Sequence, residues 1–158
     1  MTVSEREHLE IRELQPDEEL PWDLLLLADP ARDLVLKYLK ESVVFVAQLG
    51  GRVVGEYVLT PAEADQWELM NIAVSPDLQG KGIGQRLVES AIHEARTRGA
   101  RQLLVGTRNS SFLQLAFYQR CGFRIVGVVP DFFVEHYEEE IIENGIRCVD
   151  MVRLALTL

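Results

Sequence analysis

Three glycines at alternate positions, Gly80, Gly82 and Gly84, stand between an apolar strand pattern and a strongly amphipathic helix pattern. Glycine lets the backbone approach a bulky group closely and adopt positive φ angles. A helix N-terminus adds N–H groups and partial positive charge. The order of strand, turn, glycine-rich segment and helix therefore predicts an anion-binding loop, which consists of Gln79, Gly80, Lys81, Gly82, Ile83 and Gly84. The alternative is a helix-capping loop that binds nothing, for which one glycine would suffice.

Two familiar phosphate motifs do not match this loop. A Walker loop requires Gly-x4-Gly-Lys-Ser/Thr, and the chain lacks that sequence. A dinucleotide fingerprint requires Gly-x-Gly-x-x-Gly and an acidic residue about 20 positions further on. Here the glycines have a different spacing, and the next predicted strand ends in Gly106-Thr107-Arg108 without an acid. Neither nucleotide motif explains the loop.

The first half of the chain predicts antiparallel strands and two helices. Strands are expected over residues 8–14, 42–49, 52–60 and 67–74, and Gly50-Gly51 is typical of a two-residue hairpin turn. A helical stretch is expected over 17–28, with a break near Pro21. Asp29 before Pro30 predicts the N-cap of a second helix, which would extend to about Lys40.

The second half predicts strand–helix units. The helix that begins after the loop has one apolar face and ends before Gly99. A buried strand follows over 103–105, then a second helix, capped within 109–111, that ends at Gly122. Strands are expected over 123–129 and 146–156, with a hairpin turn at Asn144-Gly145. The complete order predicts an α/β (α+β) fold: a mixed sheet with helices on both faces.

Size and composition favour one domain over residues 1–158, since 47% of the residues are hydrophobic and no linker divides the chain. No apolar run approaches the roughly 18 residues of a spanning helix, and the charged N-terminus predicts no secretion signal. Cys121 and Cys148 are weak evidence for a disulfide and ordinary for a cytosolic protein. We therefore expect a cytoplasmic protein that does not bind membranes.

Charge and histidine content argue against two further classes of protein. The formal net charge is -9, which disfavours non-specific binding to nucleic acid. It is compatible with a cationic partner, although acidity also serves solubility alone. The three histidines lie far apart and the chain has no Cys-x-x-Cys, so no metal site is expected.

Residues 67–128 resemble the GCN5-related N-acetyltransferase (GNAT) superfamily, and the order of elements extends the resemblance over the whole chain. The resemblance implies a mostly antiparallel sheet with one splayed parallel strand pair, and acetyl-CoA as acyl donor. Its pyrophosphate loop has the form Arg/Gln-x-x-Gly-x-Gly/Ala. Three linked motifs carry the resemblance: Ile72-Ala73-Val74, Gln79-x-x-Gly82-x-Gly84 and Tyr118-x-x-x-Gly122-Phe123.

The resemblance also assigns cofactor contacts. The main chain of Ile72, Ala73 and Val74 would pair with the pantetheine arm in the gap between the splayed strands. The family's strand-end asparagine normally lies seven residues before the tyrosine, where this chain has Ser111. We expect Asn109, two residues earlier, to make the pantetheine contact instead. Its alternative role is that of a residue in a helix-capping loop.

Acetyl transfer to an amine requires a base, because a primary ammonium has a pKa near 10.4. Glu68 matches the position of the family's glutamate base. It lies four residues before Ile72, so we expect both side chains on one partly desolvated face. The alternatives are a solvent-facing carboxylate at Glu68 and a base made of water molecules. Tyr118 matches the family's acid; otherwise it is a core aromatic. Asn71 is a candidate contact for the acceptor or a water, or a plain strand residue.

The acceptor side is expected to include the early helices and residues 130–145. That segment interleaves acidic and aromatic residues, which suits a cationic amine or forms a solvated loop. The expected activity is acetyl transfer from acetyl-CoA to a polyamine, an aminoglycoside, another small amine or a protein amine. A non-catalytic acyl-CoA sensor and a nucleotide-phosphate binder are the alternatives. The resemblance makes a homodimer through the final strands plausible.

Overall fold

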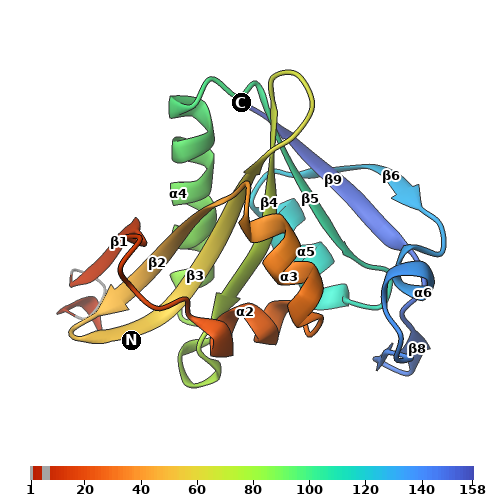
Figure 1. Cartoon of the computed structure of the whole chain (residues 1–158), viewed down its shortest axis with the longest axis horizontal. Helices are drawn as coiled ribbons and strands as arrows, with labels where there is room; N and C mark the ends of the chain where they lie inside the picture. Colours follow the sequence, from red (N-terminus) through yellow and green to blue (C-terminus); the bar gives the residue numbers. More distant parts are fainter. Residues whose placement is uncertain (1, 5–7) are drawn as a thin grey trace.

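A single seven-stranded sheet forms the centre of the computed structural model, which describes residues 2–4 and 8–158 (Figure 1). Its strand order is β1-β2-β3-β4-β5-β9-β6, and every pair is antiparallel except β4 with β5. The predicted mixed sheet is confirmed. The strands are β1 (Leu9–Glu13), β2 (Val43–Leu49), β3 (Arg52–Pro61), β4 (Gln66–Val74), β5 (Gln102–Arg108), β6 (Arg124–Val129) and β9 (Met151–Thr157).

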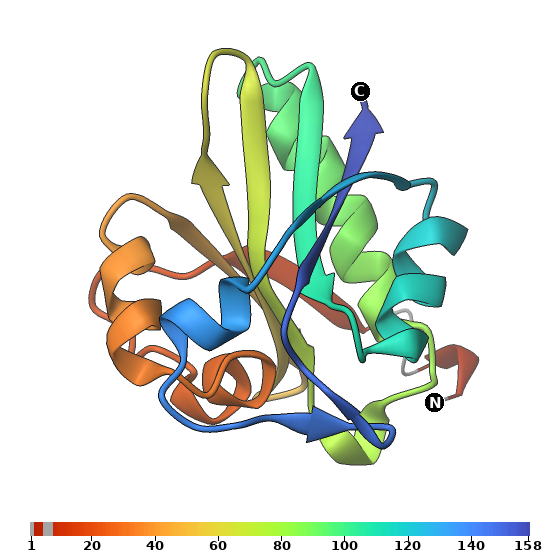
Figure 2. The ribbon, with the colours of Figure 1, turned by 90° about the vertical axis from the view of Figure 1, so that its right-hand side faces the viewer.

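Helices cover both faces of the sheet, as Figure 2 shows. On one face lie α2 (Trp22–Ala28) and α3 (Arg32–Leu39), whose Leu25 and Val35 pack against Val58 of β3. On the other lie α4 (Ile83–Thr97) and α5 (Phe112–Arg120). The apolar side of α4 packs into the larger core cluster, which confirms the predicted amphipathic helix.

The first helix is shorter than the sequence predicts. Residues 17–20 are not helical, and α2 begins at Trp22, directly after Pro21. Glu18 ends a turn in which its N–H bonds to the carbonyl of Gln15, and its carboxylate pairs with Arg12 at 2.7 Å. This turn fixes the chain in a non-helical path before the proline.

The predicted N-cap at Asp29 is wrong. Helix α3 begins at Arg32 with Ala31 as its N-cap, and Asp29 is the C-cap of α2. The carboxylate of Asp29 instead accepts the N–H of Ala31 at 3.1 Å. Aspartate commonly bonds to the backbone two residues further on, and this local turn replaces the cap.

The C-terminal strand is split. The Asn144-Gly145 hairpin is confirmed, but it joins only the short strands β7 (Ile142–Glu143) and β8 (Ile146–Arg147). Asn109 causes the break before β9, because its Oδ1 accepts hydrogen bonds from the N–H groups of Val149 and Asp150. Residues 130–145 also contain α6 (Phe132–His136), which is too short to give a helical period in the sequence.

The parallel pair β4–β5 opens partway along its length. The ladder runs from Gln66 opposite Gln102 to Leu69 opposite Val105 and then stops. Beyond that point β5 continues its pairing with β9, whereas β4 continues its pairing with β3. The edge of β4 that faces β5 is therefore free of ladder hydrogen bonds over residues 70–74, and this is the splayed pair that the fold class required.

Cys121 and Cys148 are both free thiols. Within residues 2–4 and 8–158, no helix is long and apolar enough to span a membrane.

Candidate functional site

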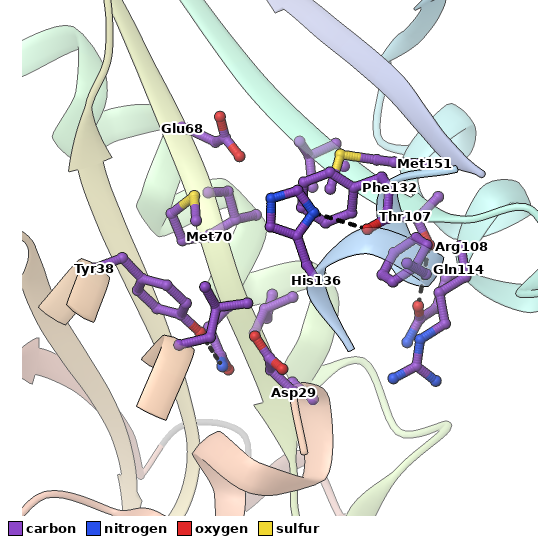
Figure 3. A pocket seen from close by; sticks show the side chains of 18 of the residues that line it. Asp29, Tyr38, Glu68, Met70, Thr107, Arg108, Gln114, Phe132, His136 and Met151 are labelled. Atoms are coloured by element: carbon purple, nitrogen blue, oxygen red, sulfur yellow. Dashed lines mark hydrogen bonds between the residues drawn. The ribbon is translucent and has the colours of Figure 1, made fainter. Parts of the chain in front are cut away.

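Two cavities meet where β4 and β5 separate. One has a volume of about 650 Å³ and is walled by α2, α3, β4, β5 and α6; we call it the Glu68 cavity (Figure 3). The other has a volume of about 690 Å³ and is walled by β4, the glycine loop and α5; we call it the loop cavity. The residues that line both are Leu27, Ala28, Ile72, Gln114, Tyr118 and Glu143.

The glycine loop forms one end of the loop cavity. Gly80 and Gly82 have φ angles of 76° and 91°, in the left-handed region that disfavours other residues. Gly82 is the N-cap of α4 and supplies no side-chain cap, so the first N–H groups of the helix are available to a ligand. Gln79 donates its Nε2 to the carbonyl of Val74 at 3.0 Å, which ties the loop to the end of β4.

The predicted loop residues divide into two sets. Gln79, Gly80, Gly82 and Gly84 line the loop cavity. Ile83 does not line the loop cavity, because its side chain is buried in the core. Lys81 is exposed and is not among the lining residues.

The strand segment Ile72, Ala73 and Val74 forms the long wall of the loop cavity. It lies in the part of β4 that has lost its pairing with β5. Backbone N–H and C=O groups on such an edge require partners, and an extended amide-containing chain can supply them. The three predicted residues are therefore brought together with the glycine loop.

Tyr118 of α5 lies at the junction of the two cavities. Its side chain is 5% exposed, and its ring contacts Phe117 and Phe123 at centroid distances of 5.4 and 5.8 Å. Among the described residues, its hydroxyl has no hydrogen-bond partner. Burial raises the pKa of Tyr118, with smaller contributions from Cys121 and Glu56. The hydroxyl is thus held protonated and free to donate at the junction.

Glu68 lines the other cavity and forms an ion pair that the sequence did not predict. Both carboxylate oxygens contact the guanidinium of Arg153 on β9, at 3.0 and 3.2 Å. Arg153 reaches Glu68 across β5, where its own ladder partner is Gly106. A Cβ at Gly106 would lie 2.7 Å from the sulfur of Met151. The glycine therefore leaves room for the side chains of β9 on this face.

The expectation that Glu68 shares a face with Ile72 is wrong. The register of β3 with β4 shifts so that Leu59 pairs with Leu69 and Val58 pairs with Asn71, which leaves Met70 as an extra residue. Such a bulge reverses the side-chain alternation. Ile72 accordingly packs in the larger core cluster, on the face that α4 covers. Glu68 lies on the other face, at the Glu68 cavity, as does Asn71. Its surroundings are an ion pair rather than an apolar sheet.

Asn71 is almost fully buried and is fixed by its amide. Its Nδ2 donates to the carbonyl of Leu25 at 3.0 Å and to the hydroxyl of Tyr38 at 2.9 Å. Burial raises the pKa of Tyr38, while the hydrogen bond from Asn71 acts in the opposite direction. Figure 3 shows Tyr38 reaching from α3 towards β4 at the edge of the Glu68 cavity.

Asn109 does not line either cavity. Its Nδ2 donates to the carbonyl of Arg147 at 3.2 Å, and its Oδ1 holds the N–H groups of Val149 and Asp150. The asparagine therefore organises the approach to β9. At the corresponding edge of the loop cavity the structure places Ser111 and Gln114.

The segment 130–147 folds over the Glu68 cavity. The hydroxyl of Tyr137 donates to Asp29 at 2.9 Å, which links the end of α6 to the α2–α3 connection. Phe132 stacks on His136 at a centroid distance of 4.2 Å, and both line the cavity (Figure 3). The acidic and aromatic residues of this segment thus contribute to the cavity wall, although Glu138, Glu139 and Glu140 are exposed.

Glu143 lies at the junction beside Tyr118 and accepts hydrogen bonds from Ser111 and Ser110, at 2.6 and 3.2 Å. Ser111 occupies the N-cap position of α5 but makes no side-chain cap. Its hydroxyl binds the carboxylate instead, which revises the capping role predicted for residues 109–111.

Arg153 and Tyr38 are site residues that the sequence did not single out, whereas Glu143 belongs to the acidic and aromatic segment 130–145 that was expected on the acceptor side. The sequence does contain a signal for Arg153. It is a charged residue on the strand face opposite to that of Val152 and Leu154. No sequence signal shows that Tyr38 meets Asn71, since 33 residues separate them. In the described residues, no group of His, Cys, Asp or Glu side chains could hold a metal ion.

Comparison with known proteins agrees with this geometry. Residues 8–123 match the model of the acetyltransferase (GNAT) family. The chain is 50% identical over 137 residues to the uncharacterized N-acetyltransferase YvbK of Bacillus subtilis (strain 168), a match that covers 87% of this chain and 88% of the relative.

Two solved structures superpose over nearly the whole chain. A GNAT family acetyltransferase from Elizabethkingia anophelis with acetyl-CoA bound has a TM-score of 0.94 at 39% identity, and the match covers 96% of this chain and 99% of that one. An IAA acetyltransferase from Bacillus cereus ATCC 14579 has a TM-score of 0.91 at 50% identity, with 95% and 99% covered. The seven-stranded sheet, the splayed parallel pair and the family match agree: this chain belongs to the acetyltransferase (GNAT) family.

Proposed function

We propose that this chain transfers the acetyl group of acetyl-CoA to a primary amine by direct attack in a ternary complex. The observation that carries the proposal is the junction of two cavities at the point where β4 leaves β5. One cavity suits an extended, anionic cofactor and the other suits an acceptor. Tyr118 stands between them.

The cofactor would lie in the loop cavity. Its pyrophosphate would accept hydrogen bonds from the backbone N–H groups of Gln79–Gly84 and of the start of α4, where the helix dipole favours negative charge. Its pantetheine arm would pair with the backbone of Ile72–Val74. The bound acetyl-CoA of the Elizabethkingia relative supports this cofactor for a chain of such similar fold.

The acceptor amine would enter from the Glu68 cavity. Glu68 would take a proton from the ammonium through a water, and the neutral nitrogen would attack the thioester carbonyl. Collapse of the tetrahedral intermediate breaks the C–S bond and releases a CoA thiolate. The attacking nitrogen loses its second proton to water, which leaves the neutral acetylated amine. Tyr118 would donate its proton to that thiolate, a role for which its protonated hydroxyl at the junction is suited.

Arg153 would fix the orientation of the Glu68 carboxylate. A two-point contact between a guanidinium and a carboxylate constrains both groups to one plane. Because each side chain is less than a quarter exposed, solvent screens the pair only partly.

A cationic acceptor fits the charge of the Glu68 cavity. Its wall carries the carboxylates of Asp29, Glu41, Glu68 and Glu143 and the cationic side chains of Lys37 and Arg108, while Arg153 pairs with Glu68. Aromatic rings of α3 and α6 line the same space. Acidic groups beside aromatic faces favour an amine by charge pairing and cation–π contact.

A non-catalytic acyl-CoA sensor is the alternative. A binder would need the glycine loop and Ile72–Val74, but it would have no use for a free tyrosine hydroxyl at the cavity junction. Binding and turnover therefore discriminate the two functions. Displacement of CoA by ATP or NAD would instead support the nucleotide-phosphate binder.

The direct experiment measures thiol release from acetyl-CoA across a panel of acceptors, with acetyl-CoA binding measured by calorimetry in parallel. The panel contains polyamines, aminoglycosides, small monoamines, peptides with a free N-terminus or lysine, and IAA, after which the Bacillus cereus relative is named. Thiol release that depends on an amine supports the proposal. Acetyl-CoA binding without acceptor-dependent release supports the sensor.

A further inference from the structure

Glu56 of β3 is a fully buried carboxyl group outside the machinery proposed above. Its exposed fraction is 0%, and within the described residues neither carboxyl oxygen has a hydrogen-bond partner. Its neighbours on the adjacent strands are Val46 and Ala73, which are also buried. A charge in such a position is costly unless it is paired, and a neutral acid still requires an acceptor for its proton.

Asn71 has the complementary need. Its Oδ1 is the one other side-chain atom that is buried without a partner among the described residues. Glu56 pairs with Ala73, and Val58, two residues further along β3, pairs with Asn71. Glu56 and Asn71 are therefore diagonal neighbours on the face that α2 and α3 cover.

The amide of Asn71 cannot satisfy Oδ1 by turning over. Its Nδ2 already donates to Leu25 and Tyr38, which fixes Oδ1 on the opposite side. An acceptor atom held in this way requires a donor from the interior. We propose that Glu56 carries a proton in the folded protein and donates it to Oδ1 of Asn71, directly or through one enclosed water, and so positions Tyr38.

The electrostatic surroundings support a neutral Glu56. Burial raises its pKa well above the ordinary value. Burial is the main cause of the raised pKa of Tyr38 and of Tyr118, and a charge on Glu56 would raise both pKa values further. An ionised Glu56 would therefore act on both hydroxyls. β2 contributes no titratable side chain. The remaining titratable groups are Arg52 and Tyr57 of β3 itself, Asp23 of α2, Arg32, Asp33 and Lys37 of α3, and Glu68 of β4; within the described residues none forms an ion pair with Glu56.

The contact has a consequence for the Glu68 cavity. An ionised Glu56 would repel Oδ1 and attract Nδ2, so the amide of Asn71 would turn and release Tyr38 and Leu25. Tyr38 lines the cavity, and its altered position would weaken acceptor binding. This last step rests on the proposed function, whereas the proton on Glu56 and its contact with Asn71 do not.

The proton is tested on the wild-type protein by the ¹³C NMR shift of its side-chain carboxyl groups, followed from pH 4 to 9. We expect one glutamate to remain protonated at pH 7, and Glu56→Gln or Glu56→Leu to remove that signal. A Glu56 that ionises with the ordinary carboxyl groups overturns the proposal. Because the titration is carried out on the wild type, the test survives if one variant does not fold.

Linkage gives the same test a second readout. A folded-state pKa above the unfolded value contributes stability that is fully present below about pH 4.3 and is lost as the pH rises through the folded pKa. The unfolding constant of wild type relative to Glu56→Gln should therefore rise about tenfold per pH unit from about pH 5 and level off once the pH exceeds the folded pKa. A ratio that is constant with pH contradicts the proposal.

The contact with Asn71 is tested by comparing the two variants. Glutamine offers Oδ1 a donor and leucine does not, so the side-chain amide signals of Asn71 should be kept in Glu56→Gln and shifted in Glu56→Leu. With the best amine of the panel, Glu56→Leu should raise the acceptor KM about fivefold or more and Glu56→Gln should not. Equal Asn71 signals in all three proteins overturn the contact, whether or not the protein proves to be an acetyltransferase.

Discussion

The carboxylate of Glu68 on β4 and the guanidinium of Arg153 on β9 form a two-point ion pair across β5, at 3.0 and 3.2 Å. The pair lies at the Glu68 cavity, close in sequence to the point after Leu69 at which β4 parts from β5. It makes the proposed base part of a fixed pair, so its role can be examined by changing either partner.

Glu68→Gln should lower kcat about a hundredfold, which is typical of the loss of a general base. The loss should be greatest below about pH 8, where the amine is largely protonated. Steady-state rates from pH 6 to 10 provide the measurement, with Glu139→Gln as a control for the removal of an exposed acid. An equal loss at every pH would argue against proton transfer to Glu68.

Arg153→Gln should lower kcat less than Glu68→Gln does, because the carboxylate remains but loses its fixed orientation. Residues that act as a pair are not additive, so the double variant should be about as slow as Glu68→Gln alone. A double-mutant cycle on kcat gives the coupling. Fully additive losses would show that Arg153 acts independently of Glu68.

The glycine loop and the fold class could be predicted because they depend on local patterns. Positive φ angles at Gly80 and Gly82, the amphipathic face of α4 and the Asn144-Gly145 turn are each set by a few neighbouring residues. The order of these elements then limits the sheets that can form.

The face of Glu68 could not be predicted from the sequence, because the bulge at Met70 depends on how β3 and β4 align. Strict alternation assumes an unbroken ladder, and a single extra residue reverses it. Similarly, asparagine at position 109 is a residue type typical of helix caps, yet Asn109 hydrogen-bonds to a segment 38 to 41 residues away. Such pairings are decided by tertiary packing.

Tyr118→Phe should reduce turnover about a hundredfold or more and leave acetyl-CoA affinity within about twofold. The ring packing against Phe117 and Phe123 is preserved, and only the hydroxyl at the cavity junction is lost. Calorimetry for binding and thiol release for turnover separate the two effects. Turnover close to that of the wild type would remove Tyr118 from the mechanism.

Gly82→Ala should weaken acetyl-CoA binding about tenfold or more, because relief of the φ angle of 91° would move N–H groups that face the proposed pyrophosphate. Gly99→Ala is the matched control. Gly99 has a φ angle of 82°, and neither position has an atom within 4 Å of an added Cβ. Both variants should therefore lose about 1 kcal/mol of stability. Equal affinity for acetyl-CoA in the two variants would contradict the assigned loop.

The most direct test of acetyl transfer follows both products with one amine of the panel at saturating acetyl-CoA. One thiol should be released for each acetylated amine detected by mass spectrometry, and Tyr118→Phe should be strongly impaired in both measurements. Tight binding of acetyl-CoA with no acetylated product from any amine would contradict the proposed acetyl transfer.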